Sequence, residues 1–387
     1  MMMRPQPVAI VGIGYSEFAR SLEADGHELA IAACDEAIRD AGLTPNDVDG
    51  VATYLGAYEH AELSQVIPGV GLNEERLKLR EDLMALAPAA MTSIHTAVEA
   101  IRSGQCQTVL TYKANKWKRG VPPGAANNAP LVGGIQQFTV PYGHSMTAQW
   151  LALWAQRHFY EYGTTCEHLG KLVVNTRKHA GLNPRATLRT PLTLDDYYRS
   201  PWISEPFRKL DCDFPIDGAG ALVITTLERA RDLKQQPIYI LGCARRDGTM
   251  EEWEMWPDLT TMASKEVSDH VWAESGLSPQ DVDVAELYDG FSFLGLCWLE
   301  DAGFCKKGEG GPFIASGAIE LGGSLPTNTH GGNLSEGRSH GVGAILEAVQ
   351  QLRGACGARQ VHDAKIAFAA NGGGPIAGAM VLAKDLP

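Results

Sequence analysis

The sequence lacks several features that would assign it to a broad class of protein. Its eight cysteines include no Cys-x-x-Cys pair and mostly lie in apolar surroundings, so we expect reduced thiols rather than a structural zinc site or a disulfide framework. No run of about 18 apolar residues is present that could span a bilayer. The first residues, MMMRPQPVAIVGIGYS, lack the apolar core and cleavage site of a signal peptide. We therefore expect a cytoplasmic protein.

Positive charge is also scarce. The 33 Lys and Arg residues face 46 Asp and Glu residues, which gives a formal net charge of -13. An acidic protein is repelled at long range by nucleic acids and anionic membranes, so we expect neither as the main partner. The net charge does not exclude local basic pockets. The 387 residues, 44% hydrophobic and 20% charged, suit a globular protein of two compact units.

An internal repeat is the strongest sign of organisation. GLTPNDVD at 42–49 returns as GLSPQDVD at 276–283, each time after a helix-like pattern and before a strand-like one. Gly42 and Gly276 are placed to end their helices in the left-handed conformation, and the proline three residues later starts a new segment. The repeat predicts a duplicated α/β fold.

Each copy reads strand, helix, strand, helix, strand, with short apolar strands of the kind that helices cover on both faces. The predicted halves are 1–235 and 236–387. The stretch at about 120–215 has no counterpart in the second half and is rich in Tyr, Trp, Arg and His. A long insertion between two compact halves predicts a cap over a substrate site.

Four motifs carry a resemblance that extends over nearly the whole chain. They are YGTTCEHLGKLVVNTRKHAGLNPRA, LDCDFPIDGAGALVIT, ELYDGFSFLGLCWLEDAGFCKKGEGG and LPTNTHGGNLSEG. With the two similar halves, they resemble the thiolase superfamily and, within it, the sterol-carrier and lipid-transfer branch. The resemblance implies the thiolase fold, in which two βαβαβ halves form a five-layered αβαβα core, and it implies a homodimer.

The groups that perform thiolase chemistry are missing. Thiolases need a nucleophilic cysteine at a helix N-terminus, which stabilises the thiolate, and the corresponding place, near Ala87, has no cysteine. The resemblance puts Ala370 at the position of the second thiolase cysteine and Arg338 at that of the Gly-His-Pro histidine. It puts Tyr288 at the position of the histidine in the His-Asp-x-Phe motif of the sterol-carrier branch. Acyl transfer to cysteine is therefore not expected, whereas binding of a CoA thioester and its enolate is.

In this respect the chain resembles the aldolases of bacterial steroid degradation. The resemblance implies a retro-aldolase that cleaves a β-hydroxyacyl-CoA side chain from a steroid or bile-acid intermediate and gives a ketosteroid and acetyl-CoA or propionyl-CoA. It also implies an auxiliary subunit with a zinc ribbon and an OB fold, often part of a hydratase. We expect no cofactor in this chain, because CoA belongs to the substrate and zinc to the partner.

Three residues are predicted to be catalytic. Tyr288 ends the strand-like segment VDVAELYD, where α/β folds display functional groups, and is expected to take the proton of the β-hydroxyl. Arg338 cannot act as a base, but it can lower the pKa of a nearby phenol or bind an oxyanion. His340 can relay protons. Each has a structural alternative. The Tyr288 ring can instead pack beneath the glycine-rich loop at 328–343, and the His340 ring can hold a backbone carbonyl. Arg338 can instead pair with Glu336 or Asp289.

Two further groups of residues are expected at the site. Asn328, Asn371 and Gly373 are predicted to stabilise the enolate through side-chain and backbone N–H groups. The segment NTRKHAGLNPRA gathers cations on an otherwise acidic chain and is predicted to bind the phosphates of CoA, although a solvated helix end is an alternative. Those cations are Arg177, Lys178 and Arg185.

Two other functions remain open from the sequence. One is a thiolase or acyltransferase that uses a different thiol, for example Cys106 or Cys297, although both lie in patterns that suggest burial. The other is a non-catalytic subunit that binds acyl-CoA or lipid and stabilises a partner enzyme.

Overall fold

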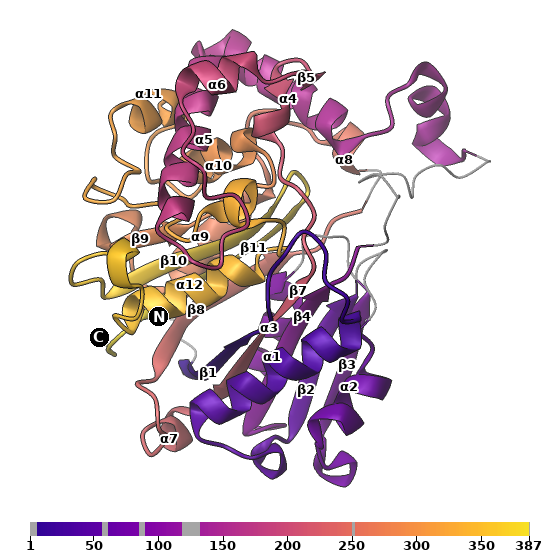
Figure 1. Cartoon of the computed structure of the whole chain (residues 1–387), viewed down its shortest axis with the longest axis vertical. Helices are drawn as coiled ribbons and strands as arrows, with labels where there is room; N and C mark the ends of the chain where they lie inside the picture. Colours follow the sequence, from indigo (N-terminus) through magenta and orange to yellow (C-terminus); the bar gives the residue numbers. More distant parts are fainter. Residues whose placement is uncertain (1–5, 56–60, 85–89, 118–131, 250–251, 387) are drawn as a thin grey trace.

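The computed structural model describes residues 6–55, 61–84, 90–117, 132–249 and 252–386. Two halves of related topology are joined, and an insert of helices lies to one side (Figure 1). None of the helices in these ranges combines the length and the apolar character needed to cross a lipid bilayer.

The first half alternates strands and helices and ends with an antiparallel strand. Its elements are β1 (Val8–Tyr15), α1 (Gly26–Ala41), β2 (Gly50–Leu55), α2 (Leu63–Val70), β3 (Leu79–Met84), α3 (Ala90–Arg102), β4 (Thr108–Asn115), β7 (Gly218–Thr225) and α7 (Leu227–Ala230). Asp25 caps α1, because its side chain accepts hydrogen bonds from the amides of His27 and Glu28, which the helix itself leaves unpaired.

The second half repeats this plan. Its elements are β8 (Ile238–Arg246), α8 (Glu252–Met255), α9 (Ala263–Ser275), β9 (Val284–Glu286), α10 (Ser292–Asp301), α11 (Gly310–Ala315), α12 (Val342–Leu352), β10 (Ile366–Gly373) and β11 (Ile376–Ala383). Gly42 and Gly276 end α1 and α9 with φ of 73° and 67°. The sequence repeat therefore predicted both helix ends correctly, since glycine enters the left-handed region without steric cost.

Short helical turns connect these elements. The 3-10 turns are Pro45–Asp47, Glu74–Arg76, Gly134–Phe138, Val140–Tyr142, Lys209–Asp211, Pro279–Asp281 and Gly357–Arg359, and a π-helical turn covers Gly332–Glu336. The π turn lies in the glycine-rich loop at 328–343, and such turns occur frequently at functional sites.

Nine strands form one mixed sheet in the order β3-β2-β4-β7-β1-β8-β11-β10-β9. The order β2-β4-β7-β1 of the first half matches β9-β10-β11-β8 of the second, and β1 and β8 pair in antiparallel fashion where the halves meet. β2 is parallel to β4 just as β9 is parallel to β10. The predicted duplication is confirmed, and each half has one more antiparallel strand than we predicted, β7 or β11. The first half also has a further strand that we did not predict, β3, which is parallel to β2.

Three hydrophobic cores separate the layers. One packs α1 and α2 against strands of the first half, and another packs α9 and α10 against strands of the second. The middle core holds α3 and α12 between strands of both halves. Along β1, Val8 and Ile10 face the middle core, whereas Ala9 and Val11 face the outer one. The strands of each half form one β layer, with helices outside each of them and α3 and α12 between them. This arrangement confirms the five-layered αβαβα core.

The insert lies between β4 and β7 in sequence but packs on the second half. It contains α4 (Thr147–Tyr162), α5 (Cys166–Gly181), α6 (Leu194–Arg199), β5 (Trp202–Ser204) and β6 (Phe207–Arg208). α5 lies against α10 and α11 (Figure 1), and Trp154 and Leu169 share a core with Phe293 of α10. The predicted boundary at residue 235 falls in the connection between α7 and β8.

Candidate active site

Tyr288 lies two residues beyond the end of β9 and is buried, with 5% of its surface exposed. Asn328 contacts the residue on each side of it. The side-chain oxygen of Asn328 accepts a 2.6 Å hydrogen bond from the amide of Leu287, and its side chain also hydrogen-bonds the carboxylate of Asp289. Asn328 has φ of 53°, a conformation that asparagine tolerates better than most residues. Asn328 is thus a frame for Tyr288, and a fixed frame suits a functional group.

Asp289 connects the end of β9 to the glycine-rich loop. Its Oδ1 accepts hydrogen bonds from the backbone amide of Asn333 at 2.6 Å and from the side chain of Asn333 at 3.1 Å. Burial raises the pKa of Asp289 to about 6, although these hydrogen bonds act in the opposite direction. Phe291 is the N-cap residue of α10 and makes no side-chain cap, whereas Asp289, two residues earlier, binds the glycine-rich loop.

Arg338 pairs with Asp213, a residue that the sequence analysis did not identify. Nε donates to Oδ2 at 2.8 Å, and Nη2 donates to Oδ1, which is the bidentate geometry of a strong ion pair. The partners considered for Arg338 from the sequence, Glu336 and Asp289, were wrong. The amide of Asp213 also donates to the carbonyl of Gly290 at 3.0 Å, so one residue of the insert joins the loops that carry Arg338 and Tyr288.

His340 has an unusual backbone conformation, with φ of 52°. A non-glycine residue in this region costs about 1–2 kcal/mol, and the surrounding contacts hold it there. Its carbonyl accepts hydrogen bonds from the side-chain amide of Asn371 at 2.9 Å and from the hydroxyl of Tyr54 at 3.2 Å. Its ring lies edge-on to Trp117, with centroids 6.4 Å apart, and the guanidinium carbon of Arg338 is 5.2 Å from the Trp117 ring. Backbone strain of this kind is frequent at functional sites.

Asn371 and Gly373 lie at the end of β10, beside the end of β9. The side-chain oxygen of Asn371 accepts a 3.0 Å hydrogen bond from the amide of Gly372. Gly373 is opposite Ile376 in the β10–β11 ladder, and a side chain there would meet Leu294 at 2.5 Å. Because β9 and β10 are parallel neighbours, their carboxyl ends bring these groups to the sheet edge that also carries Tyr288.

An aromatic cleft of about 420 Å³ opens beside this edge. Its lining includes Phe138, Tyr142, Trp150, Trp154 and Trp253. The Trp253 ring lies 5.7 Å from that of Trp154 and 6.1 Å from that of Trp150. A Cβ atom on Gly374 would lie 2.3 Å from the Trp253 ring, so the wall of the cleft packs directly on the turn that follows Asn371. A cleft of this size and lining suits a bulky apolar ligand.

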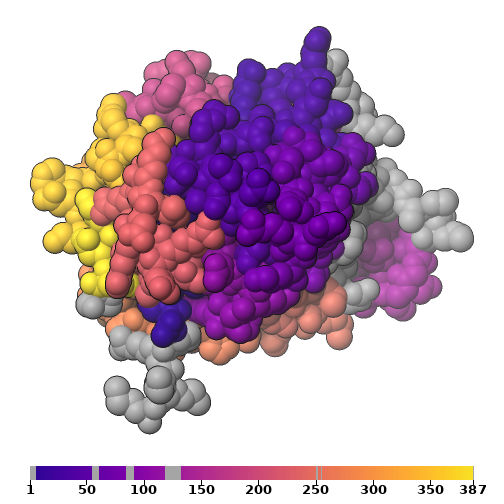
Figure 2. Space-filling view, turned by 90° about the horizontal axis from the view of Figure 1, so that it is seen from below, coloured from indigo at the N-terminus to yellow at the C-terminus, as the bar shows by residue number. Residues whose placement is uncertain are grey.

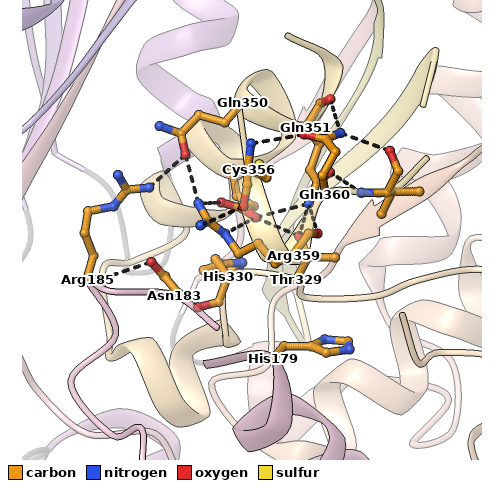
Figure 3. Close-up of polar contacts among 12 residues, drawn as sticks. His179, Asn183, Arg185, Thr329, His330, Gln350, Gln351, Cys356, Arg359 and Gln360 are labelled. Atoms are coloured by element: carbon orange, nitrogen blue, oxygen red, sulfur yellow. Dashed lines mark hydrogen bonds and ion pairs between the residues drawn. The ribbon is translucent and has the colours of Figure 1, made fainter. Parts of the chain in front are cut away.

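A buried polar network joins the glycine-rich loop to the insert and to β9, and Figure 3 shows the part of it around Asn183 and His330. His330 Nδ1 is 2.8 Å from Oε2 of Glu286, and its Nε2 is 3.9 Å from Glu336. Burial lowers the pKa of His330, but the two carboxylates outweigh it and raise the pKa to about 9. Asn183 of the insert donates to the His330 carbonyl at 2.8 Å and to Glu336 at 2.9 Å. The network fastens the insert to the loop, and His330 is its central cation.

Comparison with known proteins agrees with this architecture. The family model for the "Thiolase C-terminal domain-like" family matches residues 248–383. The chain is 40% identical to the 17-hydroxy-3-oxo-4-pregnene-20-carboxyl-CoA lyase of Mycobacterium tuberculosis, over 89% of this chain and 91% of that protein. It is 37% identical to a steroid side-chain-cleaving aldolase of Thermomonospora curvata, over 92% of each.

The chain belongs to the thiolase superfamily, in its branch of steroid side-chain-cleaving aldolases. A solved structure, described as an Ltp2-ChsH2(DUF35) aldolase, superposes with a TM-score of 0.89 at 36% identity and covers 99% of both chains. The resemblance predicted from sequence motifs is therefore confirmed.

Within this thiolase-fold protein, the cysteines are poor candidates for a nucleophile. Burial raises the pKa of all eight thiols, to about 11 for Cys106 and well above the usual value for Cys297. Ala370 lies buried in β10, and Ala87 is outside the described residues. The thiolate needed for acyl transfer is therefore disfavoured wherever the chain has a cysteine.

The three cations predicted to bind CoA do not form one cluster in the structure. Arg177 is 7% exposed, and burial lowers the pKa of its guanidinium. Lys178 is exposed, whereas Arg185 is half-buried with its guanidinium carbon 4.0 Å from the centre of the Tyr15 ring. Their side-chain hydrogen-bond partners are Ser335, Glu320 and Gln350, respectively. The expected common phosphate site was wrong for Arg177, which is used inside the fold; for the other two, CoA binding stays a prediction.

Proposed function

We propose that this enzyme, a carbon–carbon lyase, cleaves the β-hydroxyacyl-CoA side chain of a steroid or bile-acid intermediate by a retro-aldol reaction. A base removes the proton of the β-hydroxyl, the bond between the α and β carbons breaks, and its electron pair moves into the thioester as an enolate. The β carbon becomes a ketone. Protonation of the enolate at its α carbon then gives acetyl-CoA or propionyl-CoA, so the reaction consumes no oxidant and no external nucleophile.

Tyr288 is assigned as the base, and His340 assists in returning the proton. Asn328 fixes the amide of Leu287 before Tyr288 and the carboxylate of Asp289 after it, and Asn371 fixes the carbonyl of His340. The enolate is assigned to N–H groups of Asn328, Asn371 and Gly373 at the carboxyl ends of β9 and β10. Preorganised donors of this kind are most effective where negative charge develops.

Arg338 is assigned as a positioning residue rather than a direct acid or base. Its Nε and Nη2 are used by Asp213, which offsets its charge, and the pair holds the segment 338–341 against the Tyr288 loop. This role differs from the tuning of a phenol that the sequence suggested, because the structure supplies a carboxylate partner from the insert.

The observation that carries the proposal is the position of the aromatic cleft. Trp253 packs on Gly374, so an apolar ring system in the cleft places its side chain next to the carboxyl ends of β9 and β10. The relatives named above act on steroid side chains, and their substrates have the bulky apolar end that this cleft fits.

We further propose an auxiliary subunit with a zinc ribbon and an OB fold, or a hydratase domain of that type, together with a homodimer of this chain. The solved structure described as an Ltp2-ChsH2(DUF35) aldolase supports an auxiliary subunit, as do exposed apolar residues on the insert. These are Phe138, Tyr142, Leu153 and Tyr160, which are 57% to 85% exposed. Large exposed apolar groups of this kind mark interaction sites. For the homodimer, β3 at the end of the sheet order offers an edge. The reaction as written requires no cofactor in this chain.

The direct test is to co-express the chain with a zinc-ribbon partner and incubate the complex with a 17-hydroxy steroid that carries a short CoA-thioester side chain. Mass spectrometry is expected to detect a 17-ketosteroid and one acyl-CoA, either acetyl-CoA or propionyl-CoA, with the ketosteroid and the acyl-CoA in equal amounts. Tight binding of intact substrate without products would instead support the non-catalytic subunit, and product formation that depends on free CoA would support acyl transfer.

A further inference from the structure

A second cleft, of about 440 Å³, lies where the two halves meet at the surface. Tyr15 at the end of β1, Arg39 of α1 and Arg353 after α12 line it together with Lys234 and Arg185. Figure 2 shows the stretches of chain involved side by side, with the coral segment around residue 235 between the indigo N-terminal region and the yellow C-terminal region. The aromatic cleft shares no lining residue with it.

The charge of this cleft is opposite to that of the chain. Four cations line it on a protein whose formal charge is -13. The two carboxylates in the lining hold the backbone of β1: Glu36 accepts from the amide of Tyr15 at 2.6 Å, and Asp40 accepts from the amide of Ile13 at 3.0 Å. Asp40 also accepts from Gln235 at 2.7 Å. The acids are thus committed to the fold, and the cations exceed them.

Arg353 is the buried anchor of the cleft. Its side chain is 8% exposed, and its Nη1 donates to Asp40 at 2.7 Å. Its Nε and Nη2 are buried and meet no hydrogen-bond acceptor among the described residues, and the same holds for Nε of Arg185. Buried guanidinium donors without acceptors are costly, so the geometry calls for an acceptor from a ligand.

Helix ends alone do not explain these cations. Arg39 and Arg353 lie at the C-terminal ends of α1 and α12, where positive charge is favourable. However, carbonyls at the end of α12 already accept from the backbone amides of Arg353, Gly354 and Ala355, and the helix-end effect does not require Lys234 or Arg185. A ligand with several acceptor oxygens accounts for all four cations together.

We propose that this cleft binds the phosphate groups of a nucleotide-sized ligand. The forked donors of arginine match phosphate oxygens, and the volume is in the range of small-molecule sites. The phosphorylated end of a CoA thioester and a free nucleotide share this chemistry. Binding there does not depend on the proposed aldolase reaction.

The ligand also acts on the glycine-rich loop through Arg185. Two residues beyond Arg185, the amide of Thr187 donates to the carbonyl of Glu336 at 3.3 Å, and that of Leu188 donates to the carbonyl of Ser335 at 2.9 Å. A phosphate held by Arg185 therefore braces the segment that leads into Arg338.

Isothermal titration of the purified chain with CoA, dephospho-CoA, AMP and inorganic phosphate tests the proposal without turnover. The double variant Arg39→Gln/Lys234→Gln changes two exposed residues and is expected to weaken binding about 10-fold or more, because it removes two of the four positive charges that line the cleft. Lys306→Gln, at a side chain that is 86% exposed outside the cleft, is the matched control and is expected to leave binding unchanged. Arg353→Gln is a second variant of the buried anchor.

The ligand series distinguishes the sources of phosphate. Tighter binding of CoA than of dephospho-CoA, with loss in the double variant, supports the nucleotide end of CoA as the ligand. Equal binding of AMP and CoA supports a free nucleotide. Binding of inorganic phosphate alone, absence of saturable binding, or an equal effect of Lys306→Gln would overturn the proposal, and a separate turnover assay shows whether the aldolase assignment stands regardless.

Discussion

Asp213 receives two hydrogen bonds from the guanidinium of Arg338 while its own amide donates to Gly290. The residue therefore connects three segments that are distant in sequence: the insert, the glycine-rich loop and the loop that follows β9. In this account the insert does more than cover the site, because it holds the segments that carry Tyr288 and His340.

Replacing Asp213 by asparagine removes the charge of the pair while keeping its size. We expect kcat to fall about 10- to 100-fold with a smaller change in KM, because misplacement of catalytic groups affects the reacting geometry more than binding. Steady-state kinetics of the complex measures this. Asp196→Asn, at an exposed carboxylate near Arg199, is the control, and an unchanged kcat in folded Asp213→Asn protein would refute the role of the pair.

The base assignment predicts a specific loss in Tyr288→Phe. The phenol is removed and the ring retained, so substrate binding is expected to persist while kcat falls about 10²- to 10⁴-fold, the usual contribution of a general base. Binding is measured by titration and kcat by product release. Tyr198→Phe, at a residue that is 41% exposed, is expected to have full activity. Comparable turnover in Tyr288→Phe would move the base to another residue.

The buried cation His330 predicts a pH-dependent stability. Its pKa is raised by folding from 6.5 to about 9, so it adds stability that is fully present below pH 6.5 and is lost as the pH rises through about 9. The difference in unfolding free energy between the wild type and His330→Asn is therefore expected to shrink from about pH 6 to about pH 9.5. Urea denaturation at several pH values measures it.

His362→Asn serves as the control for this series, because the His362 side chain is 93% exposed. It is expected to leave the stability profile unchanged. A difference between the wild type and His330→Asn that stays constant with pH would mean that His330 is not the cation of the network.

The contact between Gly374 and Trp253 predicts that a side chain at position 374 weakens substrate binding. Gly374→Ala would place a methyl group against the Trp253 ring, so the cleft wall must shift and KM for a steroid thioester is expected to rise about 10-fold, equivalent to about 1.4 kcal/mol. Gly104→Ala is a matched control, because Gly104 also has a positive φ, 77°, but its side-chain position is open. Equal KM values in both variants would show that the aromatic cleft does not bind the substrate.

The sequence predicted what local patterns determine. The turn chemistry after Gly42 and Gly276 is local, so the repeat and the duplicated halves followed from it. The pairing of Arg338 with Asp213 joins residues 125 positions apart, and no periodic pattern reports such a contact. Arg177 was misjudged despite a usable signal, since Val173 and Ala180, four residues before it and three after it, place it on the buried face of α5.

In the proposed reaction the bond to the side chain breaks with formation of a thioester enolate. The most direct measurement is a single turnover of the complex in D₂O with a 17-hydroxy steroid CoA thioester, followed by mass spectrometry of the released acyl-CoA. One deuterium is expected at the α carbon of acetyl-CoA or propionyl-CoA, together with an unlabelled ketosteroid. Released acyl-CoA without deuterium would contradict the enolate and with it the retro-aldol mechanism.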